Sequence, residues 1–188
     1  NANILTNWGN AAVASGYISV TSTIVGIYAN NQVGVNISNN SLTSASLASG
    51  TTTRGIFLEY TGSSPSGTFT NSISNNTVTV TNTTSSTFEM IRSQGIGTAN
   101  ATATINLNNN TMAACSTAGS FIGIINSSAP GVLNINNNII RGTVVTGTSS
   151  AFTGISNSGS IVTTTNINNN QLGNATGGAV NYTVASSG

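Results

Sequence analysis

The chain has 188 residues, of which 3% are charged, and its formal net charge is +1. An ordinary globular protein carries about 25% charged residues, so Asn, Ser, Thr and Gly must cover this surface instead. The three basic residues form no stripe that could neutralise phosphates, and no run of roughly 20 apolar residues is present, so neither nucleic acid nor membrane insertion is expected.

Composition does not change along the chain, so we predict a single repeat domain over residues 1–188. Many Ser, Asn and Gly with little charge can also indicate disorder. Against disorder, 37% of the residues are hydrophobic, and they recur at regular places where stacked repeats could bury one another. The chain shows no initiating Met, no signal segment and no capping helix, and we expect it to be a segment of a longer solenoid or filament.

One motif recurs along the chain: an apolar anchor, a variable residue, two asparagines, a further variable residue and a second apolar residue. A degenerate copy over residues 3–8 is expected to open the series. The anchors are separated by 33, 36, 34, 28 and 32 residues, and they are Ile4, Ile37, Ile73, Leu107, Ile135 and Ile167. A fixed period of this length predicts a repeat architecture.

A second signal, a glycine followed by isoleucine, occurs once in most periods. Met90-Ile91-Arg92 takes the same place without the glycine. From Ile37 to Ile135, the separation from each anchor to the next of these isoleucines is nearly constant, at 17 to 20 residues, whereas the connection onward varies from 10 to 17. Length variation confined to one connection is typical of a solenoid. These isoleucines are Ile27, Ile56, Ile91, Ile124 and Ile155.

The local pattern is that of strands. Residues 74–80 and 101–107 alternate in twos, β-branched residues dominate, and helix propensity is poor because Gly, Ser, Thr and Asn are frequent. A β-propeller or an antiparallel array would also use strands, but the longer period and signature of a propeller blade are missing. We therefore predict an all-β fold, a right-handed parallel β-helix of about six coils of about 33 residues.

In this arrangement equivalent residues stack about 4.8 Å apart. The second asparagine of each motif is expected at a corner, where Asn tolerates left-handed backbone, and its amide can bond to the copies above and below. The predicted ladder is Asn40, Asn76, Asn110, Asn138 and Asn170. Inward columns are expected from the anchors, the glycine-motif isoleucines and the residues after the ladder, with a partial aromatic stack of Phe88, Phe121 and Phe152.

The sequence offers little catalytic chemistry. Glu59 and Glu89 are the sole carboxylates, and Arg54 and Arg92 lie within five residues of one or the other, so surface ion pairs are predicted. Two glutamates cannot form a calcium cage. The chain has no His and a single Cys, which excludes a zinc site, so no cofactor or metal is expected. Cys115 is predicted to be a buried, inert thiol. The chain is not expected to be an enzyme.

Two binding functions stay open. The Thr-rich strands after the ladder suggest an ice-binding array, although their hydroxyls align in part of the turns only. Carbohydrate contact is conceivable through Tyr28, Tyr60 and Tyr182, or through the corner at residues 61–70.

The Ile-x-Asn-Asn-x-apolar motif, followed by a Thr/Ser-rich strand and Gly-Ile, resembles the β-helix repeats of very long surface proteins of Bacteroidetes-type bacteria. These include adhesin-like proteins exported by the type IX secretion route. The resemblance implies a non-catalytic structural rod or stalk at the bacterial cell surface. Its expected partners are adjacent coils or other copies stacked end to end, and surface glycans. The alternatives are an ice-binding solenoid and a carbohydrate-binding or polysaccharide-degrading β-helix whose active residues lie outside this segment.

Overall fold

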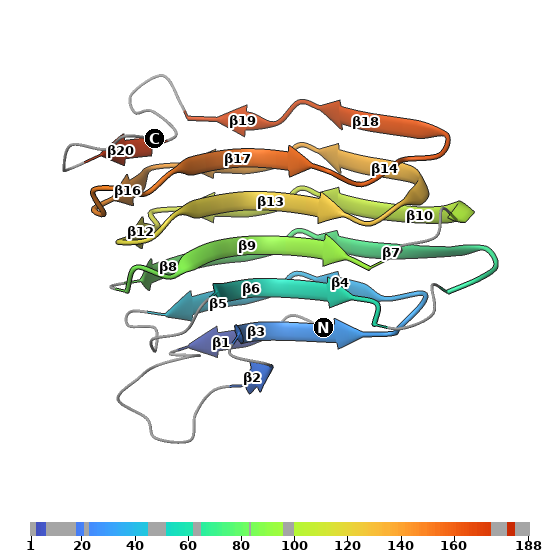
Figure 1. The fold of residues 1–188 in the computed structure, drawn as a ribbon, viewed down its shortest axis with the longest axis horizontal. Helices are drawn as coiled ribbons and strands as arrows, with labels where there is room; N and C mark the ends of the chain where they lie inside the picture. Colours follow the sequence, from blue (N-terminus) through green and yellow to red (C-terminus); the bar gives the residue numbers. More distant parts are fainter. Residues whose placement is uncertain are drawn as a thin grey trace.

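The computed structural model describes residues 3–6, 18–20, 23–44, 52–61, 65–82, 84–95, 100–173 and 180–182. These residues form strands and connections, with no helix among them. The strands are arranged in three sheets that run the length of the molecule, and successive turns lie as layers (Figure 1). The predicted parallel β-helix is confirmed.

The three sheets are called sheet 1, sheet 2 and sheet 3, and along the chain a turn passes through sheet 1, then sheet 3, then sheet 2. Sheet 1 contains β1 (Ile4–Thr6), β5 (Ser41–Ser44), β8 (Thr77–Asn82), β11 (Thr111–Ala113), β12 (Ser116–Thr117), β15 (Ile139–Arg141), β16 (Thr143–Val145), β19 (Gln171–Leu172) and β20 (Val180–Tyr182). Sheet 2 contains β4 (Asn36–Ser38), β7 (Phe69–Ser74), β10 (Asn100–Asn108), β14 (Pro130–Asn136) and β18 (Thr164–Asn168). Sheet 3 contains β2 (Ile18–Val20), β3 (Thr23–Asn30), β6 (Thr52–Glu59), β9 (Thr87–Gln94), β13 (Phe121–Ser127) and β17 (Phe152–Asn157).

Neighbouring strands pair in parallel, apart from β2, which pairs antiparallel with β3. The register joins equivalent residues of the motif, as in Ile37 with Ile73 and Ile135 with Ile167. A register slip of one residue would turn every side chain to the other face, so the repeating apolar pattern selects this pairing.

The two asparagines of each motif have different roles at the corner between sheet 2 and sheet 1. The first adopts left-handed backbone, with φ between 55° and 59°, at Asn39, Asn75, Asn109, Asn137 and Asn169. Asn tolerates this region better than other residues with a Cβ. The sharp turn then directs the second asparagine into the interior, so the left-handed residue is the one before the ladder.

The second asparagines form a continuous ladder. The amide Nδ2 of each one donates to Oδ1 of the next, over 2.8 Å from Asn40 to Asn76, 3.0 Å to Asn110, 3.1 Å to Asn138 and 2.9 Å to Asn170. The steps are 36, 34, 28 and 32 residues long, so these five asparagines bound four turns. Before them the chain adds a turn from Asn3 to Asn40 that is described in part, and after Asn170 it adds a partial turn, so fewer than the expected six coils are complete.

The opening copy of the motif is shifted relative to the prediction. Asn3 Nδ2 donates to Asn40 Oδ1 over 2.9 Å, so Asn3 is the ladder residue, and Leu5 pairs with Leu42. Ile4 pairs with Ser41 and is 78% exposed, so it is no anchor. The reason is the pleat: a residue directly after a ladder asparagine faces outward.

The interior contains the predicted apolar columns. Ile56, Ile73, Ile91, Leu107, Ile124 and Ile135 are fully buried, and Ile37 is almost so. Ile27 and Ile155 are partly buried and pack against this core. Ile167 is 44% exposed, which corrects the prediction that it is buried, because no described strand stacks above β18 in sheet 2. The Phe88, Phe121 and Phe152 rings form the expected stack, with centroids 6.4 and 5.4 Å apart.

The glycine of the second motif has a steric cause. In sheet 3 the paired residues on either side of Gly55, Met90, Gly123 and Gly154 keep one register, and these four residues lie between them. A Cβ on Gly123 would lie 2.5 Å from the carbonyl oxygen of Gly154 and 2.6 Å from Cδ1 of Ile140. Close approach of the next turn and of sheet 1 therefore favours glycine at this place.

Candidate functional site

Four of the five charged residues lie together on the outward face of sheet 3. We call this group the polar cluster; with its neutral neighbours it comprises Tyr28, Arg54, Phe57, Glu59, Glu89, Arg92 and Gln94. Strands β3, β6 and β9 bring these side chains side by side, because the outward positions of adjacent turns are in register. Arg141, in β15 of sheet 1, lies apart from them.

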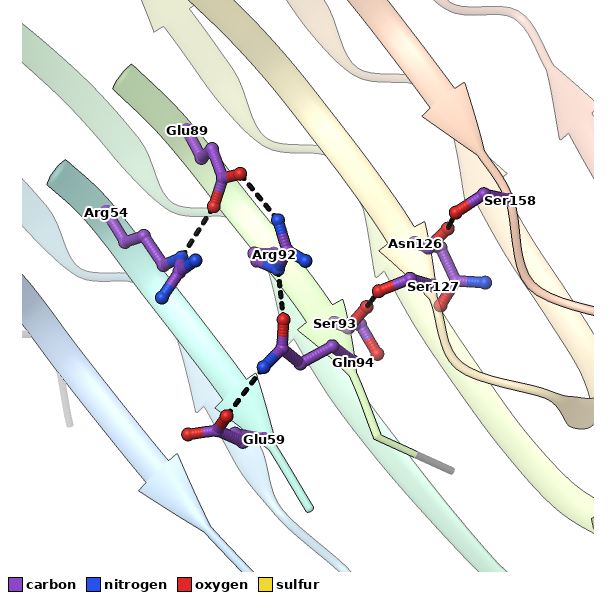
Figure 2. Close-up of polar contacts among 9 residues, drawn as sticks. All are labelled: Arg54, Glu59, Glu89, Arg92, Ser93, Gln94, Asn126, Ser127 and Ser158. Atoms are coloured by element: carbon purple, nitrogen blue, oxygen red, sulfur yellow. Dashed lines mark hydrogen bonds and ion pairs between the residues drawn. The ribbon is translucent and has the colours of Figure 1, made fainter. Parts of the chain in front are cut away.

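Glu89 is the centre of the ion pairs in the cluster (Figure 2). Its Oε2 lies 2.5 Å from Nε of Arg54, the residue opposite it on β6, and its Oε1 lies 2.5 Å from Nη1 of Arg92 on its own strand. Glu89 is 5% exposed. A buried carboxylate needs charged partners of this kind to offset its lost hydration.

Hydrogen bonds extend the cluster from Arg92 to β3. Arg92 Nε donates to Gln94 Oε1 over 2.5 Å, and Gln94 Nε2 donates to Glu59 Oε1 over 2.6 Å (Figure 2). The Tyr28 hydroxyl donates to Glu59 Oε2 over 2.6 Å. Burial, and then the neighbouring Glu59 carboxylate, raise the pKa of Tyr28 to about 12. The phenol therefore stays a proton donor to Glu59 at neutral pH.

Phe57 is an aromatic residue on the outward face that other side chains cover. It is 1% exposed, its ring stacks on Tyr28 with centroids 5.4 Å apart, and the Arg54 guanidinium carbon lies 4.2 Å from the ring centroid. Cation–π contact and ring stacking of this geometry stabilise the sheet from outside. The cluster thus joins three turns by packing as well as by charge.

An open depression of about 290 Å³ lies beside the cluster. It is lined by Thr23, Tyr28, Asn30, Arg54, Phe57, Glu59 and Thr61. Hydroxyl, amide, carboxylate and guanidinium groups next to an aromatic ring are able to contact a sugar, with hydrogen bonds to its hydroxyls and packing against its ring.

The two carboxylates do not flank a common point. Arg54, the residue paired with Glu89, is five residues before Glu59 on β6, which corresponds to roughly 16 Å along an extended strand. Glycosidase carboxyl groups are roughly 5 to 9.5 Å apart around one bond. The backbone therefore does not place Glu59 and Glu89 as an acid and nucleophile pair.

The structure separates the residues that the sequence grouped. The predicted surface pairing holds for Glu89 with Arg54 and Arg92, although the carboxylate is buried. Glu59 instead accepts hydrogen bonds from the neutral Tyr28 and Gln94. Gln94 and Phe57 were not singled out from the sequence; aligning the glycine motifs, which places Phe57 opposite Arg92, could have found Phe57.

The other tyrosines are not in the cluster. The Tyr60 hydroxyl donates to the carbonyl oxygen of Gln32 over 2.8 Å and accepts from the Asn71 amide, so it fastens a corner. Tyr182 pairs with Val145 through its backbone, and its side chain lies outside the described part of the chain.

Polar columns also continue through β13, beside the cluster. The Ser127 hydroxyl is 3.5 Å from the carbonyl oxygen of Ser93, and the Ser158 hydroxyl is 3.5 Å from that of Asn126 (Figure 2). Asn126 is fully buried, and its Nδ2 donates to Asn157 Oδ1 over 2.8 Å. These contacts satisfy polar groups between turns.

The outward face of sheet 1 has an interrupted hydroxyl array. Ser41 pairs with Thr77, but Thr111 pairs with Ile139 and Ala113 with Arg141. The side chains that would order water thus change from turn to turn. The register expected from the sequence is correct here.

The described ranges also bear on metal binding and on membrane crossing. Within them, no three His, Cys, Asp or Glu side chains gather where they could hold a metal ion. The same ranges contain no helix of the length and apolarity that crossing a membrane requires. Cys115 is a free thiol and is buried, at 1% exposure.

Comparison of the chain with protein-family models, with curated proteins and with solved structures gives no match. Statements about function therefore depend on the geometry of the chain itself.

Proposed function

We propose that the chain is a non-catalytic structural rod or stalk of an extracellular surface adhesin or filament. The observation that carries the proposal is the uninterrupted ladder from Asn3 to Asn170. Its side-chain amides join each described turn to the next through hydrogen bonds of 2.8 to 3.1 Å. A stack of this kind resists bending and stretching, because each turn contacts its neighbours through all three sheets.

The surface supports the same proposal. The outer columns of sheet 2 are Asn, Ser and Thr apart from Val132, and amides bond along the rod, as from Asn134 to Asn106 and from Asn166 to Asn134, each over 2.8 Å. An uncharged face with internally satisfied amides suits an inert spacer. At the far end, Ile167 and Leu172 are 44% and 54% exposed and continue the apolar columns outward, as expected of a stack that extends by adding turns.

Electron microscopy of the native material tests the proposal. We expect a continuous rod that runs past both ends of this segment, with a rise near 4.8 Å per turn. Discrete globular particles with covered ends would contradict it, and attention would then turn to glycan binding.

A second candidate is carbohydrate binding, which the depression beside Tyr28 favours. Calorimetric titration with a panel of neutral and acidic oligosaccharides tests this candidate. Binding that is abolished by Tyr28→Ala but kept in the matched Tyr60→Phe variant would support it. Equal heats for all proteins and for buffer would remove it.

A further inference from the structure

The ladder asparagines above Asn40 share one inter-turn contact: Nδ2 of each donates to the carbonyl oxygen of the apolar anchor in the turn below. Asn76, Asn110 and Asn138 also donate from Nδ2 to the ladder residue above. The anchor acceptor is Ile37 for Asn76, Ile73 for Asn110, Leu107 for Asn138 and Ile135 for Asn170, over 2.7 to 2.9 Å.

Asn40 departs from this pattern. Its Nδ2 donates to Asn76, and its Oδ1 accepts from Asn3, but the described residues supply no anchor carbonyl below it. Asn40 is 5% exposed, and its second amide hydrogen has no acceptor in the described chain. A donor without an acceptor at a nearly buried residue is destabilising.

The missing acceptor corresponds to an open place in the stack. Among the described strands, β4 is the edge of sheet 2 at this end, whereas sheet 1 continues to β1 at the same end. A groove of about 250 Å³ lies in this place, lined by Asn3, Ile27, Asn36, Ile37, Ser38 and Asn40. Its lining combines the apolar side chains of Ile27 and Ile37 with the amides of Asn3, Asn36 and Asn40.

The backbone of β4 is prepared for a further strand. Val35 O accepts from Ser72 N over 2.8 Å, and Asn39 N donates to Ser74 O over 3.2 Å, so the odd-numbered residues face β7. Successive peptide groups of a strand point to opposite sides. The N–H and C=O groups of Asn36 and Ser38 are therefore directed away from β7, towards the groove.

We propose that this groove is a strand-acceptor site, filled by an extended parallel strand from a further turn of the same repeat. The anchor carbonyl of that strand would accept from Asn40, and its apolar side chain would stack on Ile37. The inference rests on the proposed rod and identifies the place at which the rod receives its next turn.

The end of a second copy fits this groove less well than a lone strand. At the opposite end of the stack, the edge strand of sheet 2 is β18, which is followed after two residues by β19 of sheet 1. The two would have to enter together, yet β1 already occupies the sheet 1 position beside the groove. A single strand that leads directly into Asn3 meets no such obstacle.

The experiment extends the full chain in front of residue 1 with five residues copied from Gly131–Ile135. This addition places an isoleucine three residues before Asn3, the spacing found between Ile135 and Asn138. We expect amide exchange at Asn36 and Ser38 to slow by about tenfold or more relative to the unextended chain, and the thermal midpoint to rise. The matched control has aspartate in place of the copied leucine and isoleucine and should give neither change.

Other outcomes would overturn the proposal. Unchanged exchange at Asn36 and Ser38 in a folded, extended chain would show that the groove does not accept the strand, whatever microscopy shows of the rod. Protection in the unextended chain that rises with protein concentration would assign the groove to a second copy. Protection in that chain at every dilution would show that the site is already closed.

Discussion

At the scale of single residues, the asparagine pair divides two tasks that the motif presents together. The first asparagine accepts the left-handed backbone, and the second is buried, where it both donates and accepts between turns. Isoleucine or threonine could do neither, since a β-branched side chain is disfavoured at positive φ and offers no amide. The Asn-Asn dipeptide is therefore required by geometry as well as by hydrogen bonding.

Replacement of a central ladder residue should be costly. Asn110→Ala removes Oδ1, which accepts from the backbone N–H and from Nδ2 of Asn76, and it removes the donor to the carbonyl oxygen of Ile73. We therefore expect a loss of roughly 2 to 4 kcal/mol in the free energy of unfolding. Urea denaturation measures this loss. The matched variant Asn106→Ala changes an outward, partly buried ladder and should cost less than about 1 kcal/mol. Equal losses would mean that the inner ladder has no special role.

Stability should fall at high pH. Burial raises the pKa of Cys115 from 9.0 to about 12 and that of Tyr60 from 10.0 to about 12, and Tyr28 is raised similarly. Between about pH 9 and pH 12 these groups are neutral in the folded state but ionise in the unfolded chain. Their contribution to the free energy of unfolding is therefore complete below pH 9 and is lost as the pH approaches 12. We expect a shallower decline between pH 8 and 11 for Cys115→Ala. An identical slope would place the cause elsewhere.

At the scale of elements, sheet 3 differs from the other two sheets because its outward face carries four of the five charged residues. Arg54 of β6 and Glu89 of β9 are 35 residues apart and meet only because the turns are in register. A salt bridge between neighbouring strands penalises a slipped register, since either charge would then lie partly buried without its partner. The cluster thus adds specificity to a stack whose other contacts are repetitive.

Glu89→Gln should destabilise the fold by about 2 kcal/mol, because two partly buried guanidinium groups lose their counter-charge. Chemical denaturation at moderate salt measures the effect. Glu59→Gln is the matched control: it removes a carboxylate that has hydrogen bonds to neutral groups, and should cost about half as much or less. A larger effect at Glu59 would contradict this account of the cluster.

At the scale of the whole molecule, the chain is a one-dimensional stack. Each turn contacts the turns above and below, and the corners project sideways. Changes in a corner need not propagate, whereas changes in the ladder displace every later turn. The varying connection length in the sequence reflects this difference.

Insertion of Gly-Ser-Gly tests the point. Between Gly67 and Thr68, in an exposed corner where a Cβ on Gly67 would meet nothing within 4 Å, we expect the thermal midpoint to change by less than about 2 °C. Between Asn109 and Asn110 the same insertion separates the left-handed residue from the ladder residue, and a fall of about 10 °C or more is expected. Circular dichroism on heating compares the two, and similar midpoints would refute the stack description.

The repeated motif is enough to predict the parallel β-helix, the ladder from Asn40 to Asn170 and the central apolar columns. The physical reason is repetition: each turn offers the same polar and apolar residues at the same spacing, so one local pattern fixes every register. The non-repetitive features were decided by the tertiary structure. These are the four bounded turns, the outward position of Ile4, the exposure of Ile167 and the contacts of Glu59. Each of these features depends on which strand of a neighbouring turn lies beside the residue, or on whether such a strand is present at all. A motif that is local in the chain does not contain that information.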